Sequence, residues 1–280
     1  MKTTPRIIII LSLVTVLISE VGHCQGKSKV EDYLKNLPKQ LKLVENTPQK
    51  YLMTAEYFNK NIYGDLLNKV KVTGEYTRGL DSGYVCWNNV FISHTYNPSE
   101  VYQENKKQDY MENLKYIPTP RTLQESFFNN FPKDIDNVYS RNLIWDAFTI
   151  ETYAWDYFDS LQLNKTYVIN NIHGSFDLAE MGKYNHSKIE LNWIGISLYN
   201  NQLCAVIEYR ALDNKIELNT NDMKSKGSEL YWGKTWISLK NKQIEHAEMY
   251  SNTIQELDIK GLTDKMTVCT KRILEFDKIK

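Results

Sequence analysis

The most constraining feature of the chain is that no proline follows Pro132, which leaves residues 133–280 free of it. Proline lacks a backbone N–H and is excluded from central strands and helix interiors. This half of the chain can therefore form uninterrupted secondary structure. From residue 188 onward, apolar and polar residues alternate with the two-residue period of half-buried strands. The runs are KIELNWIGISL, QLCAVIEYRA, ELYWGKTWISL, QIEHAEMY, TIQELDI and MTVCTKRILEF.

Shorter runs of the same kind occur earlier, in YLMTAEYF, KVKVTGEYTRG and YVCWNNVFISHTY. One segment, about residues 137–161, has a helical period instead. At 100° per residue its apolar side chains share one face, and they are Ile144, Ala147, Phe148, Ala154, Trp155, Phe158 and Leu161. The sequence therefore predicts an α+β fold, with a curved antiparallel β-meander of about eight or more strands wrapped around one long helix.

Two stretches resemble each other closely: ISLYNNQLCAVIEY at 196–209 and ISLKNKQIEHAEMY at 237–250. Each places two residues, with Asn first, between alternating runs: Asn200–Asn201 and Asn241–Lys242. Asn tolerates the left-handed backbone of a tight type I′ turn. The pattern predicts two hairpins of one meander that share turn chemistry, with a duplicated binding element as the alternative.

The chain begins with two basic residues, Lys2 and Arg6, followed by twelve uncharged residues, Ile7–Ile18. A helix needs about 20 apolar residues to cross a bilayer, so this run is too short to anchor a span. It matches a secretory signal instead, with lipid attachment at Cys24 as the alternative. We expect export to the periplasm, the outer surface or the medium. The expected parts are a signal peptide at 1–24, a polar tether with a short helix at 25–49 and a single α+β domain at 50–280.

The expected mature chain is close to neutral, since 32 of the 34 basic and 33 of the 34 acidic residues lie beyond residue 24. Nucleic acids and anionic lipid surfaces require clustered basic charge, so we expect neither as a partner. No later stretch is apolar enough for a transmembrane span. Three cysteines remain, Cys86, Cys204 and Cys269; we expect small buried side chains, with a disulfide between one pair as the alternative. The oligomeric state is left open.

Catalytic and ligand-binding motifs are missing from the sequence. The histidines beyond the leader show no HxxxH or HExxH spacing, and neither a GxSxG elbow nor a GxxxxGK phosphate loop occurs. We therefore expect no metal and no cofactor, and favour a protein without catalytic activity.

One carboxylate lies in an unusual place. Glu151 falls in the middle of the apolar face of the expected helix, where an unpaired charge is costly. It is the single candidate catalytic residue, as the general acid/base of a secreted hydrolase with Asp156 or Asp159 as the second acid. The alternative is a structural carboxylate bonded to a Tyr hydroxyl, a Trp N–H or an arginine such as Arg210.

Large aromatic side chains supply a candidate ligand site. Trp232 and Trp236 share one face of their strand with Lys234, while Tyr231 and Ile237 share the other. One of these faces must cover the helix, and the second packs under loops, lines a cavity or meets a partner. The first hypothesis is that an apolar or amphipathic ligand lies between helix and sheet. Its candidate contacts are Glu151, Trp155, Trp193, Trp232 and Trp236.

The segment LYWGKTWISLKNKQIEHAEMY, with the helix and meander before it, resembles uncharacterised secreted bacterial proteins. More distantly, the strand–turn–strand WISL-KNK-QIEHAEM is similar to the sheet of periplasmic lipoprotein-carrier proteins. That resemblance covers about residues 140–280 and implies a half-open barrel that wraps a helix and shelters acyl chains. The proline-rich middle of the chain and the long N-terminal tether depart from this pattern, and no functional residue is carried over.

Three functions follow from these observations. The first is an exported, non-enzymatic protein that binds an apolar or amphipathic ligand. The second is the secreted hydrolase that uses Glu151. The third is a scaffold or interaction protein with no pocket, whose second sheet face binds another protein.

Overall fold

The computed structural model describes residues 47–96, 102–132, 136–169, 174–178, 181–186 and 188–279. The chain divides into two compact units, residues 1–39 and 40–280, and the described residues all belong to the second. The expected signal peptide, and the expected tether up to residue 46, lie outside the described residues.

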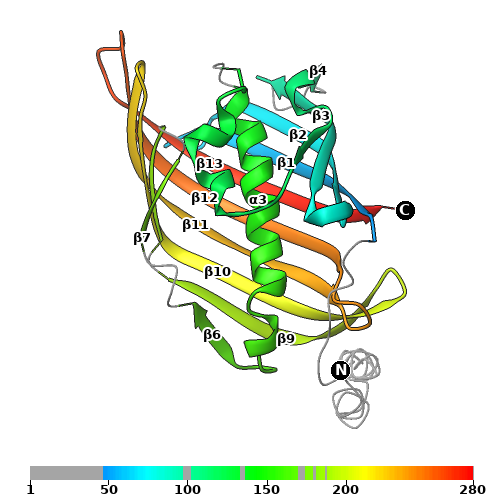
Figure 1. Ribbon diagram of the computed structural model, residues 1–280. Helices are drawn as coiled ribbons and strands as arrows, with labels where there is room; N and C mark the ends of the chain where they lie inside the picture. The colour runs from blue at the N-terminus through cyan, green and yellow to red at the C-terminus, as the bar shows by residue number, and fades with distance from the viewer. Residues whose placement is uncertain are drawn as a thin grey trace, which may run out of the picture. The chain divides into compact units, whose positions relative to one another are not determined.

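The described strands form one antiparallel sheet in the order β4-β3-β2-β1-β13-β12-β11-β10-β8-β7 (Figure 1). In addition, β5 pairs with β3, and β9 pairs with β10 and β6. Because β1 pairs with both β2 and β13, the two ends of the described chain meet in the middle of the sheet. The bounds are β1 (Gln49–Asn61), β2 (Leu66–Arg78), β3 (Val85–Thr95), β4 (Gln103–Lys107), β5 (Leu114–Tyr116), β6 (Thr166–Ile169), β7 (Gly174–Asp177), β8 (Gly182–His186), β9 (Ile189–Tyr199), β10 (Gln202–Asn219), β11 (Met223–Ser238), β12 (Ile244–Ile259) and β13 (Met266–Ile279).

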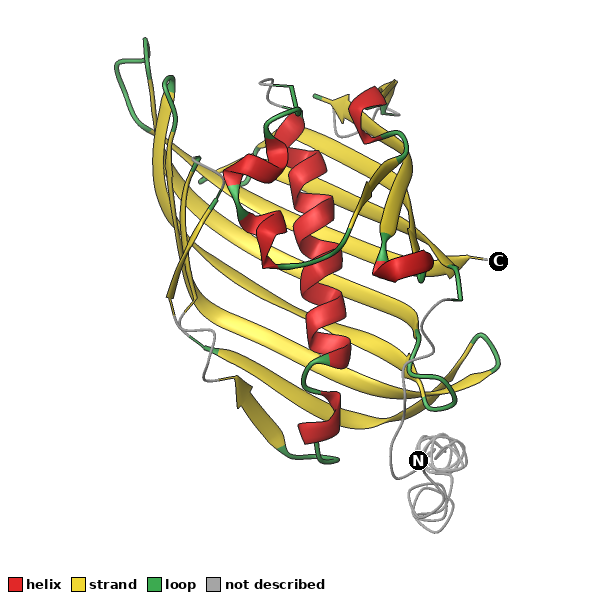
Figure 2. Cartoon of the chain, viewed as in Figure 1, coloured by secondary structure: helices red, strands yellow, loops and turns green. Residues whose placement is uncertain are grey.

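The fold class predicted from the sequence is wrong. The α-helix of the described chain, α3 (Asn137–Trp155), has 19 residues, whereas six strands of 13 to 18 residues make up the centre of the sheet. Figure 2 shows α3 lying across one face of the sheet, with a few short helical turns beside it. These 3-10 turns are Asp81–Gly83, Asp109–Met111, Pro120–Leu123, Glu125–Phe128 and Phe158–Ser160. The described region is therefore mainly β, and the helix is a short cover rather than a long rod enclosed by strands.

The helix is shorter than predicted: it ends at Trp155, and the apolar residue Phe158 lies in the 3-10 turn that follows. The N–H of Asp156 closes α3 on Thr152 O at 3.0 Å, and Phe158 then begins a 3-10 turn. The Phe158 ring lies 6.1 Å from that of Trp193 and 5.1 Å from Lys242 Nζ. The helical period thus continues in the sequence beyond Trp155, but Phe158 packs against Trp193 and Lys242 from a 3-10 turn.

Side chains alternate between the two faces of the sheet. We call the face crossed by α3 the helix face and the opposite one the reverse face. The core lies on the helix face, where Tyr51 stacks on Phe276 with 4.3 Å between ring centroids. Its buried side chains include Met53, Ala55, Val70, Val72, Tyr209, Ala247 and Leu274 of the sheet and Leu143, Ile144, Ala147, Ile150 and Ala154 of α3.

The turn between β9 and β10 confirms the first hairpin prediction, since Asn200 and Asn201 have φ values of 47° and 59°. The second predicted turn is wrong. The loop between β11 and β12 runs from Leu239 to Gln243, and Lys242 rather than Asn241 takes the left-handed conformation, with φ 62°. The Asn241 side chain instead accepts a hydrogen bond from Gln243 N at 3.1 Å. Similar sequences therefore give two different turns.

The three cysteines of the described chain are free: Cys204 is buried, while Cys86 and Cys269 are half-buried. Within the described ranges, no helix combines the length and the apolar character needed to cross a membrane. The leader, with Cys24, lies outside those ranges.

Candidate functional site

Glu151 is buried on the helix face and is held by two side chains of β2. Its carboxylate accepts a hydrogen bond from the Tyr76 hydroxyl at 2.9 Å and lies 3.3 Å from Arg78 Nε. Burial raises the pKa of Glu151, while Arg78 and the Tyr76 hydroxyl act to lower it. These contacts are those of a structural carboxylate, with Tyr76 as the hydroxyl donor and Arg78 as the cation. Arg210 instead pairs with Glu190, at 2.6 Å.

Cations and an aromatic ring surround the acids at this end of α3, and the charge of Asp156, one of the two predicted second acids, acts to raise the pKa of Glu151. The Arg78 guanidinium lies over the Trp155 ring at 3.7 Å, and Trp155 Nε1 donates to Lys242 O at 2.7 Å. Asp159 accepts a hydrogen bond from Lys242 Nζ at 3.2 Å. Glu151 is therefore paired with Arg78, and Asp159 with Lys242.

The structure does not bring the five predicted ligand-binding residues together. Tyr231 reaches the helix face, where its hydroxyl bonds that of Tyr153 in α3, so its neighbour Trp232 points to the reverse face. There Trp232 stacks with Tyr250 at 6.1 Å between ring centroids. Trp236 also lies on the reverse face, beside the ring of His246 at 4.9 Å. Glu151 and Trp155 therefore contribute to one face of the sheet, and Trp232 and Trp236 to the other.

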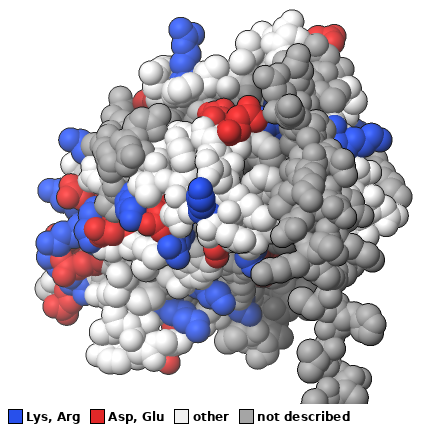
Figure 3. All heavy atoms as spheres, turned by 90° about the horizontal axis from the view of Figure 1, so that it is seen from below, with Lys and Arg blue, Asp and Glu red and all other residues white. Residues whose placement is uncertain are grey.

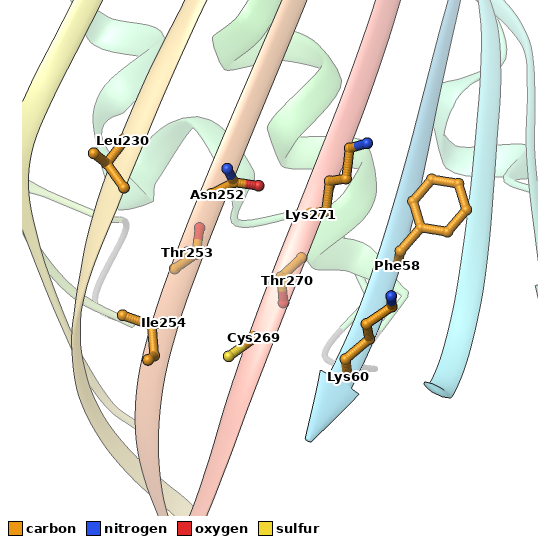
Figure 4. Close-up of a pocket in the computed structure, with 9 residues that line it drawn as sticks. All are labelled: Phe58, Lys60, Leu230, Asn252, Thr253, Ile254, Cys269, Thr270 and Lys271. Carbon is orange, nitrogen blue, oxygen red and sulfur yellow. The ribbon is translucent and has the colours of Figure 1, made fainter. Parts of the chain in front are cut away.

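A pocket of about 370 Å³ lies on the reverse face, over β1, β13, β12 and β11 (Figure 4). We call it the reverse-face pocket. Strand register builds it: Phe58 stands opposite Lys271, and Cys269 stands between Lys60 and Ile254. Its lining residues are Phe58, Lys60, Leu230, Asn252, Thr253, Ile254, Cys269, Thr270 and Lys271.

The reverse-face pocket combines apolar walls with positive charge. Leu230 and Ile254 are 39% and 51% exposed, respectively, so their hydrocarbon surface is accessible to a ligand. Lys60 and Lys271 add two exposed ammonium groups to the lining. Figure 3 shows basic and acidic side chains interspersed on the described surface seen from below. Such a lining suits a ligand that has an apolar part and an acidic group.

Sequence reasoning missed this pocket because its residues come from strands whose pairing is not local. Phe58 and Lys60 follow the alternation of β1, and Cys269 and Lys271 follow that of β13, but the pairing of β1 with β13 joins opposite ends of the described chain. The alternation in each run was visible in the sequence. No turn signal or spacing identified the partner strand.

No protein-family model matches the chain, and no curated protein matches it significantly. Comparison with solved structures finds the crystal structure of a DUF1329 family protein from Desulfovibrio piger, which is 8% identical in sequence. The alignment covers 82% of this chain and 85% of that chain, with a TM-score of 0.12. A likeness of this size carries no argument about fold or function, so the resemblance to lipoprotein carriers stays a prediction.

Proposed function

We propose that the protein is an exported, non-enzymatic binding protein whose ligand is a medium-chain fatty acid held in the reverse-face pocket. The observation that carries the proposal is the lining of that pocket, in which Phe58, Leu230 and Ile254 stand beside Lys60 and Lys271. Export rests on the leader sequence, with its basic start and uncharged run.

The size and charge of the pocket favour one acyl chain. Ligand pockets commonly have volumes of about 300–1,000 Å³, and about 370 Å³ lies at the small end of that range. Each CH₂ group removed from water contributes about 0.8 kcal/mol. A carboxylate beside Lys60 and Lys271 adds charge attraction, which also selects an acid over an uncharged alcohol of the same length.

The proposal places the amphipathic ligand on the opposite side of the sheet from the one first expected. Side chains of α3 and the central strands fill the part of the helix face that α3 covers, with Ile144, Ile150 and Phe276 fully buried. Glu151 is engaged by Arg78 and Tyr76, which supports a binding role over hydrolysis at that residue.

Reversing the two charges of the pocket is expected to weaken fatty-acid binding selectively. In the K60E/K271E variant, decanoate should bind at least about tenfold more weakly, because attraction becomes repulsion at the carboxylate. The control is K50E/K240E, which changes the net charge equally at two exposed lysines outside the pocket. Displacement of a dansyl-labelled fatty acid by decanoate measures both affinities.

Decanol provides the second comparison, since it has the chain without the charge. Wild type and K60E/K271E should bind decanol equally, within about twofold. The proposal is rejected when wild-type protein fails to bind decanoate at about 1 mM, a very weak affinity. It is also rejected when K50E/K240E loses as much affinity as the pocket variant.

A further inference from the structure

A continuous row of hydrogen-bonding side chains crosses the helix face. Register places the members directly opposite one another from β2 to β10. Adjacent strands lie about 4.8 Å apart, so six strands give a row roughly 24 Å long. We call it the polar row, and its members are Asn68, Asn59, Thr270, Thr253, Glu229 and Asn214.

The polar row is linked by hydrogen bonds along most of its length. Asn59 donates to Asn68 at 2.7 Å and accepts from the Thr270 hydroxyl at 2.7 Å. Tyr184, from β8, donates to Glu229 Oε2 at 2.6 Å. Figure 4 shows Thr253 and Thr270 pointing away from the reverse-face pocket, toward the side where α3 lies. Thr253 and Thr270 thus contribute to the lining of the reverse-face pocket, but their side chains belong to the polar row on the helix face.

The polar row is partly exposed to solvent, although hydrogen bonds connect its members. Five of its members are half-buried, and Asn214 is buried. Amide and hydroxyl groups both donate and accept hydrogen bonds, so they retain capacity for a ligand beyond their mutual bonds. Glu229 supplies the single formal charge of the row, which disfavours an anionic ligand.

Buried polar atoms without hydrogen-bond partners lie near the polar row, in Arg272 of β13 and Asp146 of α3. Arg272, two residues beyond Thr270 on β13, donates to the Asp146 carboxylate of α3. Arg272 Nε and Asp146 Oδ2 are buried and have no hydrogen-bond partner among the described residues. The Asp146 side chain is 10% exposed. Buried polar atoms without partners are rare in folded proteins, and here they lie beside the half-exposed row.

We propose that the polar row is a second binding surface, for a neutral oligosaccharide. A sugar chain presents hydroxyl groups that donate and accept, which matches the amides, hydroxyls and carboxylate of the row. The strand spacing is comparable with the length of one sugar ring, so successive units meet successive strands. Tyr184, which is bonded to Glu229 and half-buried, places an aromatic ring at one end of the row.

Removing two hydroxyl groups from the middle of the row tests this proposal. Calorimetric titration with cellohexaose, chitohexaose and xylohexaose should show that at least one binds wild-type protein below about 1 mM. In T253V/T270V its affinity should fall at least about tenfold, because two hydrogen-bonding groups are lost with little change of shape. The matched control is T54V/T73V, a half-buried cross-strand pair on the reverse face.

A second variant separates the row from general damage to the fold. Glu229→Gln keeps the shape and removes the acceptor charge, and it should lower affinity at least about threefold with an unchanged near-ultraviolet circular dichroism spectrum. Failure of all three hexaoses to bind overturns the proposal, and so does an equal loss in T54V/T73V.

Discussion

Replacing Arg272 by methionine is expected to lower the free energy of unfolding by about 3–5 kcal/mol. The Arg272 side chain is 12% exposed and donates to Asp146, which is 10% exposed. The guanidinium also lies 5.6 Å from the centre of the Tyr57 ring. Without this cation the Asp146 carboxylate is buried with no counter-charge. The free-energy cost of that unpaired charge is larger than the net stabilisation that the ion pair provides.

The loss in free energy of unfolding caused by Arg272→Met should depend on pH. Burial raises the pKa of Asp146 to about 6, although Arg272 acts to lower it. A folded-state pKa above the usual 3.8 means that the folded protein holds this proton more tightly. The resulting stabilisation is complete below about pH 4 and is lost as the pH rises through about 6. Without Arg272 the pKa of Asp146 rises further, so the variant should be less destabilised at pH 5 than at pH 8.

Two further variants complete the test of the Arg272 prediction. D146L/R272M removes both charges and should recover most of the lost stability, since apolar replacement of a buried pair is often neutral or stabilising by about 1–4 kcal/mol. Arg210→Met removes a half-exposed arginine paired with Glu190 on the reverse face and should change stability by less than about 1 kcal/mol. Urea denaturation measures all three. Equal effects of Arg272→Met and Arg210→Met would contradict the assignment of a buried pair.

Local sequence patterns predicted the elements of this fold better than its assembly. The alternation in residues 188–279 predicted strands that the structure contains, and Asn200–Asn201 predicted a type I′ turn that it also contains. The length of α3 was overestimated, because a helical wheel cannot show that Phe158 packs against Trp193 from a 3-10 turn. The sheet is larger than the C-terminal meander because β1 pairs with β13 and thereby joins β2 and β3 to it.

Long-range pairing also explains which site residues were found. The helical wheel of the sequence placed Glu151 among apolar side chains, and the Glu151 side chain is buried in the structure. Its partner Tyr76 is 75 positions away in the chain, and Thr270 and Asn59 are separated by 211. No local rule links such residues, so the reverse-face pocket and the polar row emerge only once β1 lies beside β13.

Replacing Gly233 by alanine is expected to lower the free energy of unfolding by about 2–4 kcal/mol. A Cβ at this position would lie 2.0 Å from Glu248 O and 2.4 Å from the Tyr209 hydroxyl oxygen. The buried Tyr209 crosses Gly233 to donate to Glu248 O at 2.8 Å. Overpacking of a core costs about 1–3 kcal/mol, and loss of the hydrogen bond adds about 0.5–1.5 kcal/mol.

Gly195→Ala is the matched control, because a Cβ at Gly195 meets no heavy atom within 4 Å. It should change stability by less than about 0.5 kcal/mol, while Gly233→Ala should lower the melting temperature by roughly 5–15 °C. Adding Tyr209→Phe removes the hydroxyl oxygen at 2.4 Å, while Glu248 O at 2.0 Å and the Cζ atom of residue 209 at 2.6 Å remain close to the added Cβ. The double variant G233A/Y209F should therefore lose less stability than the sum of the single changes, which urea denaturation of the four proteins in the cycle measures. Strict additivity of the two changes would show that the Tyr209 hydroxyl and a Cβ at position 233 do not compete for the same space.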